Sequence, residues 1–336
     1  MAKKLIQRKN YSLTKSPFFR LHSRDALARL FGLTLPEIEA IVSSPSNALY
    51  KMYEDVASKR YITAPLPSLA HIHKRIARLF ARVAPPAYLQ SATKKRSYKT
   101  NAELHKKNSR IFKIDIQKYY ESINYGAIFN FFKEKMQCSV DVSTMLARLC
   151  TVSARGRTHL PTGSSLSPIL SYWVHCELFD RIKSICDSAG CVMSLYVDDI
   201  TVSGVNATTA MISKLQNEIA KVGLISHKIQ MFDGVPATIT GVIVHAGRLA
   251  LPHNRAKDIR LLRQSMDTMP SADADATLSK LVGKLNEAGQ FVAGYNAIKK
   301  NVLTTHATVW TRITENRVAK SKAAARRKRA KLLAGV

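Results

Sequence analysis

The sequence has no paired cysteine motif, no long apolar run and few acidic residues for its length of 336 residues. Its five cysteines form no CxxC pair and no metal-ligand spacing with histidine, which argues against a disulfide scaffold and a zinc module. No stretch of about 18 apolar residues predicts a transmembrane helix, and the basic N-terminus lacks the apolar core of a signal peptide. We therefore expect a cytoplasmic protein with reduced thiols.

The shortage of acidic residues leaves a large positive charge. Lysine and arginine total 52 against 23 aspartate and glutamate residues, a formal net charge of +29. The surplus is spread over the whole length, and no basic amphipathic helix with an aromatic-rich apolar face indicates a membrane surface. Because 46% of the residues are hydrophobic, the chain should still fold around a substantial core. The charge predicts a polyanionic partner, most simply a nucleic acid.

Two adjacent aspartates interrupt a run of strand-forming residues in SLYVDDITVSG, residues 194–204. A hairpin explains them if Tyr196–Val197 pairs with Ile200–Thr201 across a turn at Asp198–Asp199, where aspartate is well tolerated. Taken alone, this stretch could be an ordinary aspartate-rich turn. A second acid, Asp115, lies inside another predicted strand over residues 111–116, in FKIDIQKYYESI.

Carboxylates in two separate apolar strands are costly unless a cation neutralises them. Mg²⁺ takes oxygen ligands, and a pair of such ions (Mn²⁺ being a substitute) supports phosphoryl and nucleotidyl transfer. In a chain this basic, we interpret the three aspartates as a site for that chemistry on a nucleic acid.

These motifs resemble those of the reverse transcriptases, and within them the bacterial retron enzymes. The order and spacing match from about Lys59 to about Val244. The resemblance is carried by YVDD (196–199), FKIDIQKYYESI, LPTGSSLSPIL (160–170), GLISHKIQMF (223–232), NAELH (101–105) and ITG (239–241), the last with Ile in place of Val. Thr162 stands where many relatives have Gln.

The resemblance implies an α+β fold of the right-hand polymerase type. We expect an N-terminal basic arm and helices over residues 1–58, including a capping box from Thr34 to Glu37 and a helix over residues 46–57. Fingers would occupy 59–109, and a palm with a split βαβ unit and an antiparallel sheet 110–248. A helical thumb over 249–316 and a basic tail over 317–336 would follow.

The resemblance also assigns the catalytic residues. Asp115, Asp198 and Asp199 would bind two Mg²⁺ with the Ile116 carbonyl as an extra ligand, and Asp199 is the least expected to contact metal directly. Tyr120 falls at the family's steric gate against ribose; only one of Tyr119 and Tyr120 can face the substrate, and we favour Tyr120.

Further nucleotide contacts are implied by the same motifs. Gly163 would allow the backbone to approach the nascent base pair. Lys228 would act on the pyrophosphate, with an ordinary surface lysine as the alternative. Candidates for the triphosphate are Lys94, Lys95 and Arg96, each of which could equally be a general phosphate contact.

Contacts to RNA or DNA complete the predicted site. Asn101 and His105 would position RNA rather than perform acid–base chemistry. The other candidates are Arg60, Arg75, Thr240, Gly241, Arg326, Arg327, Lys328 and Arg329.

For function, the resemblance implies an RNA-directed DNA polymerase that copies its own structured non-coding RNA from an RNA 2′-OH. The product would be branched multicopy single-stranded DNA, used in anti-phage defence with a separately encoded effector or toxin. A diversity-generating or abortive-infection reverse transcriptase is a second reading, against which NAELH and ITG argue. A basic RNA-binding scaffold with incidental activity is a third.

Overall fold

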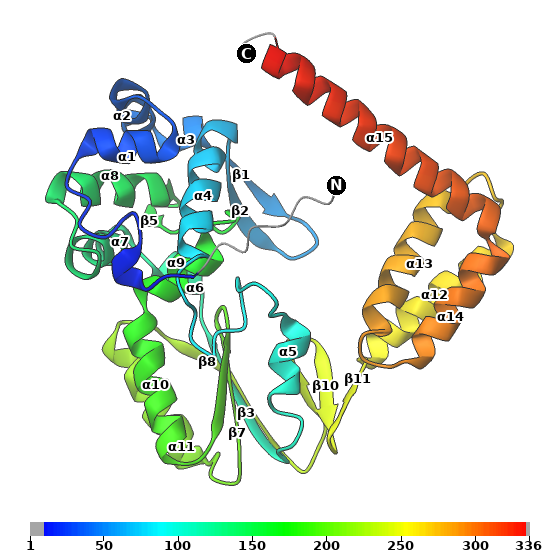
Figure 1. Cartoon of the computed structure of the whole chain (residues 1–336). Coiled ribbons are helices and arrows are strands. Elements are labelled where there is room, and N and C mark those ends of the chain that lie inside the picture. Colours follow the sequence, from blue (N-terminus) through cyan, green and yellow to red (C-terminus); the bar gives the residue numbers. More distant parts are fainter. Residues whose placement is uncertain (1–9, 334–336) are drawn as a thin grey trace. The chain divides into compact units, whose positions relative to one another are not determined.

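The computed structural model describes residues 10–333, with side chains up to Arg326. The chain divides into two compact units, Met1–Val235 and Pro236–Val336, which are described separately below (Figure 1). Helices and strands are mixed in both, and every pairing between the named strands is antiparallel. This confirms the coarse prediction of a mixed fold with antiparallel sheets.

The first unit is built on a four-stranded sheet with the order β6-β7-β3-β8. Its strands are β3 (Arg110–Ile116), β6 (Val192–Tyr196), β7 (Asp199–Ser203) and β8 (Ser226–Asp233). Alternation along β3 buries Phe112, Ile114 and Ile116 on one face, over which α10 (Cys176–Ser188) and α11 (Thr209–Lys221) lie (Figure 1). The opposite face carries Lys113 and Asp115 and is therefore the face available to a ligand.

An N-terminal helical layer and two small hairpins complete this unit. The helices pack around a cluster of fully buried aromatic rings, Phe18, Phe80 and Phe132. The elements are η1 (Leu13–Lys15), α1 (Arg24–Phe31), α2 (Leu35–Ser43), α3 (Ser46–Leu49), β1 (Tyr50–Asp55), β2 (Arg60–Pro65), α4 (Pro67–Phe80), α5 (Tyr98–Glu103), α6 (Tyr119–Ser122), α7 (Tyr125–Asn130), a π-helix (Phe131–Lys135), α8 (Val140–Cys150), β4 (Val152–Ala154), β5 (Arg157–His159) and α9 (Ser167–Val174).

The capping box predicted at Thr34 and Glu37 is confirmed at the start of α2. The helix predicted over residues 46–57 is wrong beyond Leu49, because residues 50–55 instead form β1 and pair with β2. All five cysteines are free and buried. Among residues 10–333, no helix has the length and apolar character needed to cross a membrane.

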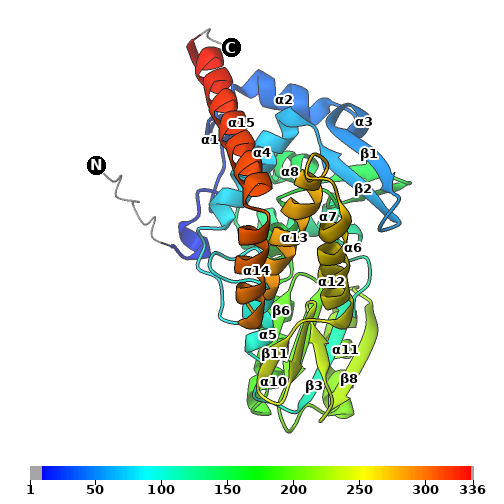
Figure 2. The same cartoon turned by 90° about the vertical axis from the view of Figure 1, so that its right-hand side faces the viewer.

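The second unit begins with a three-stranded sheet of order β11-β10-β9, made of β9 (Ala237–Ile239), β10 (Val242–His245) and β11 (Arg248–Ala250). Helices α12 (His253–Thr268), α13 (Ala274–Ala288) and α14 (Gly294–Thr305) follow (Figure 2). Leu278, Leu281 and Leu285 are buried in the core of this unit. The last helix, α15 (Ala307–Leu333), is continuous, so the predicted tail from residue 317 begins within a helix. The division of the chain at Val235 also precedes the predicted palm boundary at residue 248.

Candidate active site

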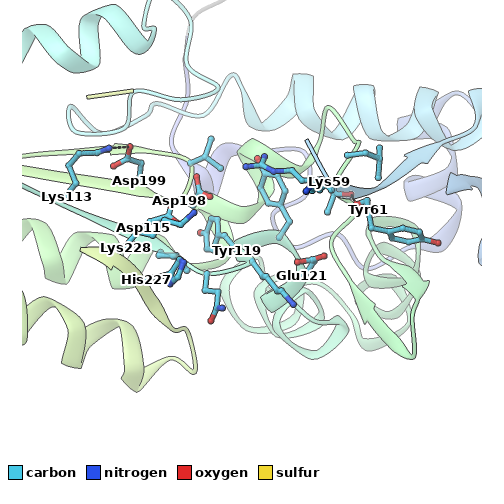
Figure 3. Close-up of a pocket in the computed structure, with 18 of the residues that line it drawn as sticks. Lys59, Tyr61, Lys113, Asp115, Tyr119, Glu121, Asp198, Asp199, His227 and Lys228 are labelled. Carbon is cyan, nitrogen blue, oxygen red and sulfur yellow. Dashed lines mark hydrogen bonds and ion pairs between the residues drawn. The ribbon is translucent and has the colours of Figure 1, made fainter. Parts of the chain in front are cut away.

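A cavity of about 660 Å³ opens on the ligand-accessible face of the four-stranded sheet (Figure 3). It contains the three predicted aspartates, so residues more than 80 positions apart in the chain are brought together. Its basic residues are Lys59, Arg60, Lys113, Lys118, Arg155, His227 and Lys228, and its remaining acid is Glu121. An anionic substrate would therefore meet a positively charged rim around a carboxylate centre.

The hairpin that carries Asp198 and Asp199 differs from the predicted one by a single residue. Tyr196 pairs with Asp199 and Leu195 with Ile200, so the turn is Val197–Asp198 rather than Asp198–Asp199. Because successive strand residues face opposite sides, this shift decides where the carboxylates lie. Asp199 becomes the first residue of β7, directly opposite Asp115 of β3, while Asp198 occupies the turn.

The turn is held in a strained conformation by residues outside it. Val197 has φ 61°, a left-handed value that is unfavourable for a β-branched residue. Its amide donates to the hydroxyl of Ser91 at 3.0 Å, and the adjacent Gln90 amide donates to the Leu195 carbonyl at 2.8 Å. On the other side, the amide of Ile116 donates to the Asp198 carbonyl at 3.0 Å. Sequence analysis missed Ser91, which carries no local motif.

The three carboxylates are in unequal electrostatic environments. Burial raises the pKa of Asp198 to about 6, with a further contribution from the negative charge of Asp115. Burial also raises the pKa of Asp199, but Lys113 opposes that shift, with its Nζ 3.3 Å from Asp199 Oδ2. Figure 3 shows Asp199 directed at Lys113, while Asp115 and Asp198 lie close to one another.

Two of these carboxylates suit a divalent cation. Their oxygens are hard ligands, and the raised pKa of Asp198 means that a cation there would relieve the cost of its charge. Within the described part of the chain, no three His, Cys, Asp or Glu side chains are gathered as a metal site. Mg²⁺ is typically held by one or two carboxylates plus substrate phosphates, so the pair Asp115 and Asp198 is sufficient.

A β-bulge directs Lys228 to this cavity. The pairing of β3 with β8 shifts between Lys113 (opposite Gln230) and Asp115 (opposite His227), so β8 has one extra residue there. Lys228 occupies the bulge with φ 46° and lines the cavity. Bulges beside active sites commonly re-aim a side chain in this way.

The two neighbouring tyrosines have different environments. Tyr119 is 3% exposed and donates its hydroxyl proton to the Ser171 carbonyl at 2.8 Å, which makes it part of the core. Tyr120 is half-buried and lines the cavity, and burial together with the charge of Asp198 raises the pKa of its hydroxyl. Tyr119 also borders the cavity, so the two rings differ in exposure and hydrogen bonding rather than in access to it. The choice of Tyr120 as the residue that faces a substrate stays a prediction.

Gly163 and Thr162 bind strand β2. The Thr162 hydroxyl donates to the Tyr61 carbonyl at 2.9 Å, and the Gly163 amide donates to the Thr63 carbonyl at 3.1 Å. A Cβ on Gly163 would lie 2.9 Å from the Ile62 side chain and 3.1 Å from the Thr63 carbonyl oxygen. The close approach that requires glycine is therefore an approach to β2, a reason that sequence analysis did not identify.

The predicted triphosphate residues do not line the aspartate cavity. Lys94 and Lys95 are exposed beside a separate hollow of about 400 Å³. Arg96 donates to the carbonyls of Pro86 and Leu89, which fixes the loop that precedes α5. Arg75 donates to the Leu30 carbonyl at 3.0 Å and is likewise outside the cavity.

Arg60 and Lys228 are the predicted basic residues of the cavity, and those that sequence analysis missed are Lys59, Lys113, Lys118, Arg155 and His227. Lys59, Lys118 and Arg155 each have a positive φ, and the Arg155 guanidinium lies 4.0 Å from the centre of the Tyr61 ring. Only the density of basic residues around them could have drawn attention to these positions.

Asn101 and His105 are fully buried, which does not fit a contact with RNA. The ring nitrogens of His105 lie 2.7 Å from the hydroxyls of Ser203 and Ser194, so this histidine joins β7 to β6. Burial lowers its pKa to about 3. The NAELH element thus contributes to the stability of the sheet that carries the aspartates.

In the second unit, Thr240 and Gly241 form the two-residue turn between β9 and β10, both with positive φ. The Arg255 guanidinium packs against Gly241, where a Cβ would lie 2.6 Å from its Nη2. Arg326 is exposed on α15. The side chains of Arg327, Lys328 and Arg329 lie outside the described residues.

Comparison with known proteins identifies the family. A model of the family "Reverse transcriptase (RNA-dependent DNA polymerase)" matches residues 44–244. The retron Se72 reverse transcriptase of Salmonella heidelberg is 31% identical over 186 residues, 54% of this chain and 48% of that protein. The retron Mx162 reverse transcriptase of Myxococcus xanthus is 22% identical over 271 residues, which are 70% of this chain and 56% of that protein. The retron Ec86 reverse transcriptase of Escherichia coli is 23% identical over 172 residues, which are 50% of this chain and 52% of that protein.

Among solved structures, a foamy viral protease-reverse transcriptase in complex with double-stranded DNA aligns with 90% of this chain and 46% of its own. That alignment has a TM-score of 0.46 and 14% identity. The aligned stretches span about half of the length of each curated relative. Because the family match covers more than half of the sequence and the curated relatives are retron enzymes, the predicted resemblance is confirmed: this chain belongs to the reverse transcriptase (RNA-dependent DNA polymerase) family.

Proposed function

We propose that this chain is the RNA-directed DNA polymerase of a retron. The observation that carries the proposal is the convergence of Asp115 and Asp198 in a basic cavity, within the part of the chain that matches the reverse transcriptase family. The four-stranded sheet would act as the palm and the β1–β2 hairpin as part of the fingers. Helices α12–α15 would act as a thumb on the product duplex, with the basic residues of α15 along phosphates.

Asp115 and Asp198, with the Ile116 carbonyl, would hold Mg²⁺, or Mn²⁺ in its place. Such ions increase the acidity of the attacking hydroxyl and stabilise the charge on the leaving pyrophosphate. The chain's own part is to fix the two carboxylates at the end of β3 and in the Val197–Asp198 turn. Asp199, paired with Lys113, would act on their arrangement without binding metal itself.

The basic residues of the cavity would bind the incoming deoxynucleoside triphosphate and the template. Lys59, Arg60 and Arg155 come from the two hairpins beside the cavity, and Lys228 comes from the bulge in β8. Lys228 would stabilise the pyrophosphate, and the Tyr120 ring would exclude a ribose 2′-OH. Lys94, Lys95, Arg75 and Arg326 remain available for contacts with the RNA away from the reacting atoms.

The retron relatives extend the proposal to the product. The protein would copy part of a cognate structured RNA from an RNA 2′-OH and would remain bound to the branched RNA–DNA. It would act in the cytoplasm in anti-phage defence, together with a separately encoded effector or toxin.

The test is to isolate the protein expressed from its native locus and to treat the bound nucleic acid separately with RNase and DNase. We expect single-stranded DNA joined to RNA through a 2′ branch, absent from the Asp198→Asn variant and present in the exposed control Asp267→Asn. Bound RNA without DNA, accompanied by polymerase activity on a supplied primer–template, would instead favour another type of bacterial reverse transcriptase. RNA without any polymerase activity would favour a scaffold.

A further inference from the structure

Asp199 and Asp115 face each other across adjacent strands. They are direct partners in the β3–β7 pairing, and both lie on the ligand-accessible face. Two carboxylates in such a position repel one another, and like charges directly opposite destabilise a sheet. If nothing else acted on Asp199, its carboxylate would join Asp115 and Asp198 around a bound cation.

Lys113 opposes that arrangement. It precedes Asp115 by two residues on β3, so its side chain is on the same face, diagonal to Asp199. Its Nζ lies 3.3 Å from Asp199 Oδ2, and the two side chains are only 16% and 18% exposed, which limits solvent screening of the pair. In Figure 3 the Asp199 carboxylate points to Lys113, away from Asp115.

We propose that Lys113 is a positioning residue that holds the Asp199 carboxylate away from the cation site, so that the site has two carboxylates rather than three. This inference rests on the proposed function, because it presumes that Asp115 and Asp198 bind a cation. The Lys113–Asp199 pair would set the affinity of the site for divalent ions. With only two carboxylates at the site, cation binding would also depend on the phosphates of the substrate.

We expect the substitutions at Lys113 and Asp199 to change the cation affinity of the site in different directions. Lys113→Met removes a positive charge and frees Asp199 to join the site, so cation binding should become about tenfold tighter. Asp199→Asn leaves Lys113 without its counter-charge, so binding should weaken. The double variant loses one charge of each sign and should return to within about twofold of the wild type.

The probe is Tb³⁺, whose luminescence is sensitised by nearby tyrosines such as Tyr120, titrated into the full chain without nucleic acid. The variants are Lys113→Met, Lys113→Arg, Asp199→Asn and the double variant, with the exposed Lys214→Met as the matched control for charge removal. Lys113→Arg and Lys214→Met should both keep the wild-type affinity. Circular dichroism and thermal unfolding identify any variant that fails to fold; if Lys113→Met does so, Lys113→Gln takes its place in the series, alone and combined with Asp199→Asn, with the same expected results.

Three outcomes would overturn the inference alone. These are unchanged binding in Lys113→Met, a double variant as tight as Lys113→Met, and a double variant about tenfold weaker than the wild type. The second would mean that Lys113 acts on the ion without Asp199, and the third that Asp199 is already a ligand. Equal Tb³⁺ binding by the wild type and Asp115→Asn would instead overturn the metal site of the proposed function.

Discussion

The amide of Val197 donates a hydrogen bond to the hydroxyl of Ser91, with 3.0 Å between the two atoms. This bond joins the loop before α5 to the turn that presents Asp198. Ser91 is 3% exposed, so water cannot easily replace it. A valine with φ 61° is stable only where its surroundings enforce that conformation, and such strained residues cost on the order of 1–3 kcal/mol.

Ser91→Ala should therefore lower kcat with little change in KM for the deoxynucleotide. The half-buried Val197 amide would lose its acceptor, at a cost of about 1 kcal/mol, and the turn would relax from the geometry that brings Asp198 beside Asp115. Steady-state kinetics on a primed template would show a decrease in kcat of about tenfold. Ser213→Ala, at an exposed position on α11, is the control. An unchanged kcat in Ser91→Ala would show that strand pairing alone fixes the turn.

Gly163→Ala should destabilise the contact between residues 160–170 and β2. The new Cβ would lie 2.9 Å from Ile62 and 3.1 Å from the Thr63 carbonyl oxygen, so β2 would have to move. We expect a loss of about 1–3 kcal/mol in the free energy of unfolding, measured with urea. Gly283→Ala is the control, because that helical site has open space around its Cβ and alanine favours helix by about 1 kcal/mol. Equal effects of the two substitutions would contradict this account.

Structural features that depend on residues close together in the chain were predicted correctly from the sequence. The capping box at Thr34 and Glu37 depends on residues three apart, and the strand predicted over 111–116 appears as Arg110–Ile116. The helix predicted over residues 46–57 was wrong because the pairing of β1 with β2 depends on partners that lie from five to fifteen residues further along the chain. Pairing between strands therefore overrode helix-compatible composition.

The candidate site shows the same limit. The aspartates were identifiable because acids in apolar strands are costly. The order of the motifs implied the other site residues through the resemblance to reverse transcriptases. The turn was misplaced by one residue because turn preferences favour aspartate, whereas the actual turn has Val197 in a left-handed conformation that Ser91 supports. Lys59 and Arg155 were missed because only the folded chain brings their hairpins to the cavity.

Two fully buried histidines predict that the protein loses stability in mild acid. Burial lowers the pKa of His73 to about 4 and of His105 to about 3. Both lie below the ordinary value near 6.5, so the unfolded chain binds protons that the folded chain does not. Stability is therefore intact above about pH 6.5 and falls as the pH decreases towards 4, by up to about 1.4 kcal/mol per pH unit for each histidine.

Urea unfolding at pH 7.5 and at pH 5 measures this loss. His105→Gln should reduce the pH dependence, because glutamine can bond to one serine without titrating, although the variant will be less stable at both values. The exposed His71→Gln should leave the pH dependence unchanged. A pH dependence that is identical in wild type and His105→Gln would contradict the assignment to His105.

Substitutions at the two adjacent tyrosines should affect different properties: nucleotide selectivity at Tyr120 and the free energy of unfolding at Tyr119. Tyr120 lines the cavity, so Tyr120→Ala should admit ribonucleotides, raising the ratio of ribonucleotide to deoxynucleotide kcat/KM by about tenfold or more while the fold persists. Tyr119 packs in the core and bonds to Ser171, so Tyr119→Phe should lower the free energy of unfolding by about 1 kcal/mol without changing selectivity. Tyr120→Phe is the conservative control, since its ring keeps the same bulk. Unchanged selectivity in Tyr120→Ala would contradict the assignment of the gate to Tyr120, because the ring that excludes the ribose 2′-OH would then have to be another one.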